Sequence, residues 1–210
     1  MCSCCVLLGE ATPRNTCVNL RLILLFASIC VFDSRPFVVF FAFLVLFCGY
    51  IFYCYSFPMP FRICKSFEIE SGHMLSKHPD KCAFPHGHTR RVEYVLEADV
   101  LDQNEMVCDF KIVKELVSDF LDRLDHSMCM NTEDPRYSDF KASYGERVIG
   151  FKGADPTTEV IAKRLFDHCR ERLAEYAKSP KEIYPVRPSV RIVKVRVWET
   201  STSWSEYWEG

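Results

Sequence analysis

Residues 86–100, HGHTRRVEYVLEADV, carry the clearest strand signal in this chain of 210 residues. Apolar residues of one parity alternate with residues of the other parity that are mostly charged. The apolar positions are Val92, Tyr94, Leu96, Ala98 and Val100, and the charged positions are Arg91, Glu93, Glu97 and Asp99. Successive side chains of a strand point to opposite faces, so this pattern predicts a strand with one buried face.

Weaker strand signals lie on both sides of this segment. Residues 61–71 predict a strand before it, and residues 190–199 predict the last strand of the chain. Residues 102–104 predict a turn, after which residues 106–108 are expected to return as a short strand.

Two amphipathic helices are expected between these strands. Asp109 is a suitable N-cap for the first helix, and the second is expected to start at Asp155-Pro156, with proline at the first helical position. Their apolar stripes are Val113, Leu116, Val117, Phe120, Leu121 and Leu124 in the first helix and Val160, Ile161, Leu165, Phe166, Cys169 and Leu173 in the second. Residues 131–153 are polar and are expected to form a long irregular connection.

The predicted order of elements is strand, strand, strand, helix, helix, strand. Strands that can pair as antiparallel hairpins, with helices grouped between them, indicate the α+β class. We therefore expect an antiparallel sheet with helices on one face.

Three histidines suggest a metal site at the ends of the first two strands. His86 and His88 are two residues apart, so their side chains point to the same side of a strand, and Gly87 leaves the backbone room. His73 closes the first strand, and pairing of the two strands would bring all three imidazoles together. Three histidines with an open fourth position are typical of catalytic zinc, although iron, copper and nickel also accept histidine ligands. The alternative is that these are ordinary surface or core histidines.

Five short motifs then appear in one order along the chain. They are His73; Cys82-Ala83-Phe84-Pro85-His86-Gly87-His88; Leu124-Asp125-His126; Pro156-Thr157-Thr158-Glu159; and Trp198-Glu199-Thr200. In this order and spacing, the chain resembles the superfamily of 6-pyruvoyl tetrahydropterin synthase and 6-carboxytetrahydropterin synthase over residues 61–210.

The resemblance implies a tunnelling fold, in which two helices back a four-stranded antiparallel sheet. It also implies a homo-oligomer, typically a hexamer of two stacked trimers. The implied metal ligands are His73, His86 and His88, holding Zn2+. The implied catalytic residues are Cys82 as general base and Asp125 with His126 as a partner pair, while Glu199 would anchor the pterin with Thr158 and Glu159 nearby.

The activity implied is that of a zinc-dependent lyase acting on 7,8-dihydroneopterin triphosphate. Three residues separate Cys82 from His86, which resembles the 6-carboxytetrahydropterin synthase (queuosine-precursor) branch. Its products would be 6-carboxy-5,6,7,8-tetrahydropterin, acetaldehyde and triphosphate. The alternatives are a 6-pyruvoyl tetrahydropterin synthase and a non-catalytic relative that binds a pterin or a metal.

Elementary chemistry agrees with these roles but leaves simpler explanations open. A cysteine beside a cation can form a thiolate near neutral pH, whereas a lone cysteine is often only a small buried apolar residue. The pair Asp125-His126 can make a base, or His126 can simply end a helix favourably. Glu159 can contact the ligand, or stabilise the first turn of its helix.

Composition separates residues 1–58 from residues 59–210. The second part holds 23 of the 26 Lys and Arg residues and 26 of the 28 Asp and Glu residues, so its charge is nearly balanced and gives no indication of nucleic-acid binding. Seven of the 12 cysteines lie in the first part. The scattered spacing of the 12 cysteines does not fit a disulfide framework, so residues 59–210 are expected to lie in a reducing compartment.

The first part contains an apolar run, residues 37–57, of 21 residues without a charge. This length is sufficient for a helix to cross a bilayer. Residues 1–58 are therefore expected to be a membrane anchor, a targeting segment or an upstream extension of the gene model, with Met59 as the natural start. The catalytic domain is expected in the cytoplasm, or else attached to a membrane or directed to an organelle through residues 1–58.

Overall fold

A computed structural model describes residues 41–43, 52–54, 60–178 and 183–209 of the chain. The chain divides into two compact units, Met1–Met59 and Pro60–Gly210. The described residues of the first unit form β1 (Phe41–Phe43) and β2 (Phe52–Cys54), which pair antiparallel. The rest of the apolar run 37–57 lies outside the described residues. Among the described residues, no helix has the length and apolar character that a bilayer crossing requires, and the role of residues 1–58 stays a prediction.

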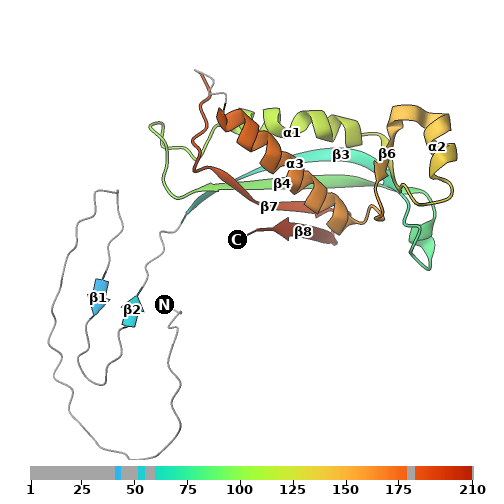
Figure 1. Ribbon diagram of the computed structural model, residues 1–210, viewed down its shortest axis with the longest axis horizontal. Helices are drawn as coiled ribbons and strands as arrows, with labels where there is room; N and C mark the ends of the chain where they lie inside the picture. Colours follow the sequence, from blue (N-terminus) through green and yellow to red (C-terminus); the bar gives the residue numbers. More distant parts are fainter. Residues whose placement is uncertain (1–40, 44–51, 55–59, 179–182, 210) are drawn as a thin grey trace, which may run out of the picture. The chain divides into compact units, whose positions relative to one another are not determined.

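The second unit is built on one six-stranded sheet with the order β6-β5-β3-β4-β7-β8 (Figure 1). The strands are β3 (Phe61–His73), β4 (His86–Ala98), β5 (Ser127–Asn131), β6 (Val148–Phe151), β7 (Arg191–Trp198) and β8 (Trp204–Trp208). β3, β4, β7 and β8 pair antiparallel, whereas β5 pairs parallel with β3 and β6 parallel with β5. The α+β class is confirmed, but the four-strand prediction is wrong because two short parallel strands extend the described sheet.

The predicted strand 106–108 is also wrong. Oδ1 of Asp102 accepts hydrogen bonds from the backbone N–H groups of Asn104 at 2.8 Å and Met106 at 2.9 Å, which closes a compact loop. Val107 and Cys108 then turn into the core instead of pairing in the sheet. The fourth antiparallel strand is β8, at the end of the chain.

Two helices, α1 (Phe110–Leu124) and α3 (Thr158–Lys178), lie across one face of the sheet, as predicted (Figure 1). Asp109 caps α1 by accepting a hydrogen bond from the backbone N–H of Lys111 at 2.7 Å. α3 begins at Thr158, two residues later than predicted, because the carbonyl group of Pro156 faces His73 instead of joining the helix. The connection 131–153 is not irregular throughout: it contains α2 (Tyr137–Tyr144), a 3-10 turn (Gly145–Arg147) and β6.

The core lies between the sheet and these two helices. Val92, Tyr94, Leu96 and Ala98 of β4 are fully buried beneath the apolar stripes of α1 and α3, in agreement with the alternation in the sequence. Val100 is exposed because the strand ends at Ala98. This packing fixes the ends of β3 and β4, where the histidines lie.

Candidate metal centre and its flanking hollows

Strand register brings the three histidines together. His73 lies directly opposite His86 in the antiparallel pair of β3 and β4, and His88 lies opposite Ser71. Residues paired in this way share a face of the sheet, and so do residues two apart on one strand. One ring nitrogen from each histidine falls within a group whose atoms are all within 4.8 Å of one another.

Backbone carbonyl groups fix the protons of two of these rings. Nδ1 of His73 lies 2.8 Å from the carbonyl oxygen of Pro156, and Nδ1 of His86 lies 2.8 Å from that of Phe84. A carbonyl can only accept, so each Nδ1 carries the proton and each Nε2 presents a lone pair. This is the usual arrangement of histidines that bind metal through Nε2.

The Nε2 atoms of His73 and His86 are close enough to share one divalent cation. Those of His73 and His86 are 3.0 Å apart, with no proton to share between them. Two facing lone pairs repel unless a cation binds both, and two ligands in a tetrahedral zinc site lie about 3.3 Å apart. Nε2 of His88 is buried and has no hydrogen-bond partner among the described residues. The three nitrogens therefore fit a zinc ion, which His73, His86 and His88 would hold.

Burial favours the neutral form of His73 and His88. Desolvation lowers the pKa of His73 to about 4, with a hydrogen bond to Pro156 opposing the shift and the nearby charge of Arg90 adding to it. Desolvation also lowers the pKa of His88. A neutral imidazole is the form that binds metal.

Glu199, which follows β7, faces this cluster. Its Oε1 atom accepts a hydrogen bond from the hydroxyl of Thr158 at 2.8 Å, and lies 3.5 Å from Nε2 of His73 and 3.6 Å from Nε2 of His88. Burial is the largest influence on the pKa of this carboxyl group and raises it, but the Thr158 hydrogen bond, the charge of Arg90 and the neighbouring His88 and His73 together lower the pKa below its ordinary value. Glu199 is therefore held as a carboxylate at the edge of the histidine cluster.

Arg90 is a residue of this site that the sequence analysis did not single out. Its side chain is fully buried and donates from Nε to Ser71 at 3.1 Å and from Nη1 to Thr158 at 3.1 Å and Glu199 at 3.4 Å. The alternation of the strand could have indicated it, because Arg90 lies two residues before Val92 and therefore on the same buried face of β4.

A hollow of about 310 Å3, the Cys82 hollow, adjoins His73 and Glu199. Cys82, Thr158, Glu159 and Trp204 also line it. It thus collects one predicted ligand, the predicted base and all three predicted pterin contacts. The pKa of Glu159 is lowered mainly by its own backbone N–H, which agrees with its position in the first turn of α3.

A second hollow of about 310 Å3, the His126 hollow, adjoins His88; Glu70, Gly72, Gly87 and Thr89 also line it. Nδ1 of His126 lies 2.9 Å from Oδ2 of Asp125, so the predicted pair forms. The backbone of His126 has a positive φ of 53°, which turns the two adjacent side chains toward each other. A hydrogen bond from the backbone N–H of Glu70 lowers the pKa of Asp125, and His126 lowers it further. Cys82 and His126 line different hollows of the chain.

A buried carboxylate supports the loop that orients His73. Asp155 accepts hydrogen bonds from the hydroxyl of Ser76 at 2.6 Å, the backbone N–H of Lys77 at 2.7 Å and the side-chain amide of Asn131 at 3.0 Å. Because Asp155 precedes Pro156, these bonds fix the carbonyl group that accepts a hydrogen bond from Nδ1 of His73.

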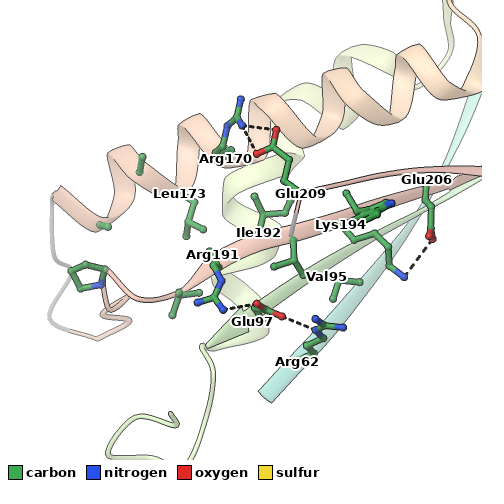
Figure 2. A pocket seen from close by; sticks show the side chains of 16 residues that line it. Arg62, Val95, Glu97, Arg170, Leu173, Arg191, Ile192, Lys194, Glu206 and Glu209 are labelled. Atoms are coloured by element: carbon green, nitrogen blue, oxygen red, sulfur yellow. Dashed lines mark hydrogen bonds and ion pairs between the residues drawn. The ribbon is translucent and has the colours of Figure 1, made fainter. Parts of the chain in front are cut away.

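A larger hollow of 790 Å3 lies between the C-terminal half of α3 and the first half of β7 (Figure 2). Its charged side chains are already paired: Glu97 accepts from Arg62 and Arg191 at 2.6 Å each, and Arg170 donates to Glu209 at 2.8 Å. Its described lining contains neither histidine nor cysteine. The predicted site residues instead line the two smaller hollows beside the histidines.

Comparison with known proteins agrees with this geometry. Residues 62–210 match the sequence model of the 6-pyruvoyl tetrahydropterin synthase family. The chain belongs to this family. The predicted family is thus confirmed, and its members are pterin synthases.

Relatives in the family carry the name 6-carboxy-5,6,7,8-tetrahydropterin synthase. The protein of Aquifex aeolicus is 31% identical over 169 residues, covering 72% of this chain and 99% of that protein. The protein of Haemophilus influenzae is 27% identical over 156 residues, covering 71% of this chain and 99% of that protein.

Solved structures share the fold of the family. An uncharacterized protein of Wolinella succinogenes has a TM-score of 0.58 at 22% identity, covering 72% of this chain and 99% of that chain. A mutant 6-pyruvoyltetrahydropterin synthase of Plasmodium vivax has a TM-score of 0.54 at 17% identity, covering 71% of this chain and 97% of that chain.

Proposed function

We propose that this protein is a zinc-dependent lyase that converts 7,8-dihydroneopterin triphosphate to 6-carboxy-5,6,7,8-tetrahydropterin, acetaldehyde and triphosphate. The observation that carries the proposal is the convergence of three histidine Nε2 atoms beside a hollow lined by Cys82 and Glu199. The name of the Aquifex aeolicus relative supports this product over a pyruvoyl product.

The reaction needs no external reductant. The bond between the first two side-chain carbons breaks, the third carbon loses triphosphate, and one water molecule supplies the second carboxylate oxygen. The two hydrogens gained by the pterin ring come from its own side chain. The protein therefore has to move protons and bind charge, but it does not have to supply electrons.

Each residue has a defined task in this proposal. A divalent ion held by the histidines supplies Lewis acidity to the hydroxyl oxygens of the substrate side chain. Glu199 accepts hydrogen bonds from the paired N–H donors on the edge of the pterin, a geometry suited to a carboxylate. Cys82 accepts one proton from the substrate side chain. His126, which Asp125 orients, accepts and returns the second proton that the side chain gives up.

The separation of Cys82 and His126 supports a homo-oligomer, for which we propose the hexamer of the family resemblance. Within one chain these residues line different hollows. The outer strands of the described sheet are β6 and β8, whose free edges can pair with another copy. Such pairing would allow His126 of one copy to approach the Cys82 hollow of the next.

The test uses the full chain loaded with zinc and incubated with 7,8-dihydroneopterin triphosphate. Mass spectrometry should detect 6-carboxytetrahydropterin and acetaldehyde. Cys82→Ala should reduce turnover by about 10²- to 10⁴-fold, the usual contribution of a general base. The matched control is Cys64→Ala, because Cys64 is exposed on β3 outside the hollow.

The other outcomes separate the alternatives. A pyruvoyl product would reject the carboxy branch but keep the site. Zinc-loaded protein that binds a pterin without turnover would instead identify a non-catalytic relative.

A further inference from the structure

The most unusual charge in the described structure is Arg90. It is the largest side chain that is fully buried, and it lies on β4 among the residues of the apolar core. Arginine is rarely buried without partners, because removing a cation from water is costly. The partners of Arg90 therefore indicate what the charge is for.

Those partners come from three separate elements. Nε donates to Ser71 on β3, while Nη1 donates to Thr158 at the start of α3 and to Glu199 beyond the end of β7. The hydroxyl of Thr158 accepts a hydrogen bond from Arg90 and donates one to Glu199 at 2.8 Å. Arg90 thus reaches Glu199 both directly and through Thr158.

Its fourth neighbour is not a hydrogen-bond partner. Nη2 lies 3.2 Å from Nδ1 of His73, but that nitrogen already carries the proton donated to Pro156. Arginine has no acceptor, so two donors face each other there. Arg90 therefore does not orient the metal ligand through this contact, and the hydrogen bonds from its Nη1 atom lead toward Glu199.

We propose that Arg90 is a positioning residue that holds Glu199 for pterin recognition. The described contacts of Glu199 with Thr158, Arg90, His73 and His88 all involve its Oε1 atom, so Oε2 is left for the ligand. This inference rests on the proposed function, in which Glu199 accepts the N–H donors of the pterin. The planar guanidinium can bind three elements at once, which a lysine ammonium at the same position cannot do with the same geometry.

The test measures binding of 7,8-dihydroneopterin to the zinc-loaded full chain by fluorescence titration. The proteins are the wild type, Arg90→Met, Glu199→Gln and the double variant, with zinc content measured for each. Arg90→Met should weaken binding by about 10- to 100-fold, typical for lost hydrogen bonds to a charged group. In the Glu199→Gln background the same replacement should change binding by less than about 3-fold, because coupled residues are not additive.

Two results would overturn the inference. One is an equal loss from Arg90→Met in both backgrounds, which would mean that Arg90 acts independently of Glu199. The other is loss of zinc in Arg90→Met or Glu199→Gln, which would assign the pair to the metal instead of the pterin. Failure of the wild type to bind 7,8-dihydroneopterin would reject the proposed function itself.

A second variant covers the case in which Arg90→Met does not fold. Thr158→Val removes the intermediate hydroxyl while keeping nearly the same shape. It should also weaken binding, and its effect should also disappear in the Glu199→Gln background. A Thr158→Val effect of equal size in both backgrounds would reject the route through Thr158 to Glu199. Arg90→Lys should restore part of the affinity lost in Arg90→Met, because it keeps the charge without the fork.

Discussion

Acidification should destabilise the metal-free protein through His73. The pKa of this buried imidazole is about 4 in the folded chain and 6.5 in its ordinary state. Between these values the unfolded chain binds a proton that the folded chain does not, so stability falls as the pH falls. The contribution is fully present above pH ~6.5 and is lost progressively toward pH ~4.

The magnitude follows from the same two values. A shift of one pKa unit corresponds to about 1.4 kcal/mol, so lowering the pH from 7.5 to 4.5 should cost roughly 2.5 kcal/mol through this residue. Urea unfolding of the full chain at both pH values, with a chelator present, measures the total loss. His73→Asn retains an N–H donor for the carbonyl of Pro156 but does not titrate. Between the two pH values this variant should therefore lose roughly 2.5 kcal/mol less of its free energy of unfolding than the wild type.

His168→Asn is the matched control, because His168 lies on α3 and pairs with Asp119 away from the cluster. It should retain the loss of stability assigned to His73, because His73 is unchanged in this variant. The reasoning is wrong if His73→Asn loses as much stability as the wild type between the two pH values.

Three further outcomes can be measured. His86→Ala should release bound zinc after dialysis, by elemental analysis, while His168→Ala retains it; equal zinc in both would exclude the site. Asp155→Ala removes three hydrogen bonds to a buried carboxylate, so the free energy of unfolding in urea should fall by about 2–5 kcal/mol, and a loss below ~1 kcal/mol would contradict this account. A Cβ at Gly150 would lie 2.7 Å from the hydroxyl oxygen of Tyr137. Gly150→Ala should therefore lower the free energy of unfolding by about 1–3 kcal/mol, and by less in a Tyr137→Phe background; equal losses would reject the contact with the Tyr137 hydroxyl as the cause.

The centre of the fold was predictable because local sequence determines it. The alternation of β4 specifies which face is buried, and the spacing of His86 and His88 places both rings on that face. Asp109 as a cap and the stripe behind it likewise depend only on neighbouring residues. Where periodicity and packing agree, the sequence alone is informative.

The edges of the sheet were not predictable in the same way. β5 and β6 are short and pair in parallel, so long-range contacts define them instead of a local alternation. α2 buries none of its residues and therefore carries no apolar stripe. β8, with the sequence WSEYW, is partly exposed throughout, so burial leaves no period of two in its residues.

Part of the candidate site was likewise not predictable from local sequence. The sequence assigned the candidate residues, but it could not divide them between two hollows, because that division depends on how loops leave the sheet. Nor could it distinguish the contacts of Arg90 from those of an ordinary charged residue in a strand. The Arg90 contact with Thr158 arises from tertiary packing of β4 against the start of α3.

The left-handed backbone at His126 creates a conflict between conformational stability and retention of the imidazole side chain. A residue with a side chain costs about 1–2 kcal/mol in this conformation, whereas glycine adopts it freely. Engineering for heat resistance would favour glycine at this position, yet that change would delete the imidazole paired with Asp125. A laboratory selection for stability alone would thus remove the imidazole that we propose as a proton carrier, and screens on this scaffold should hold residue 126 fixed.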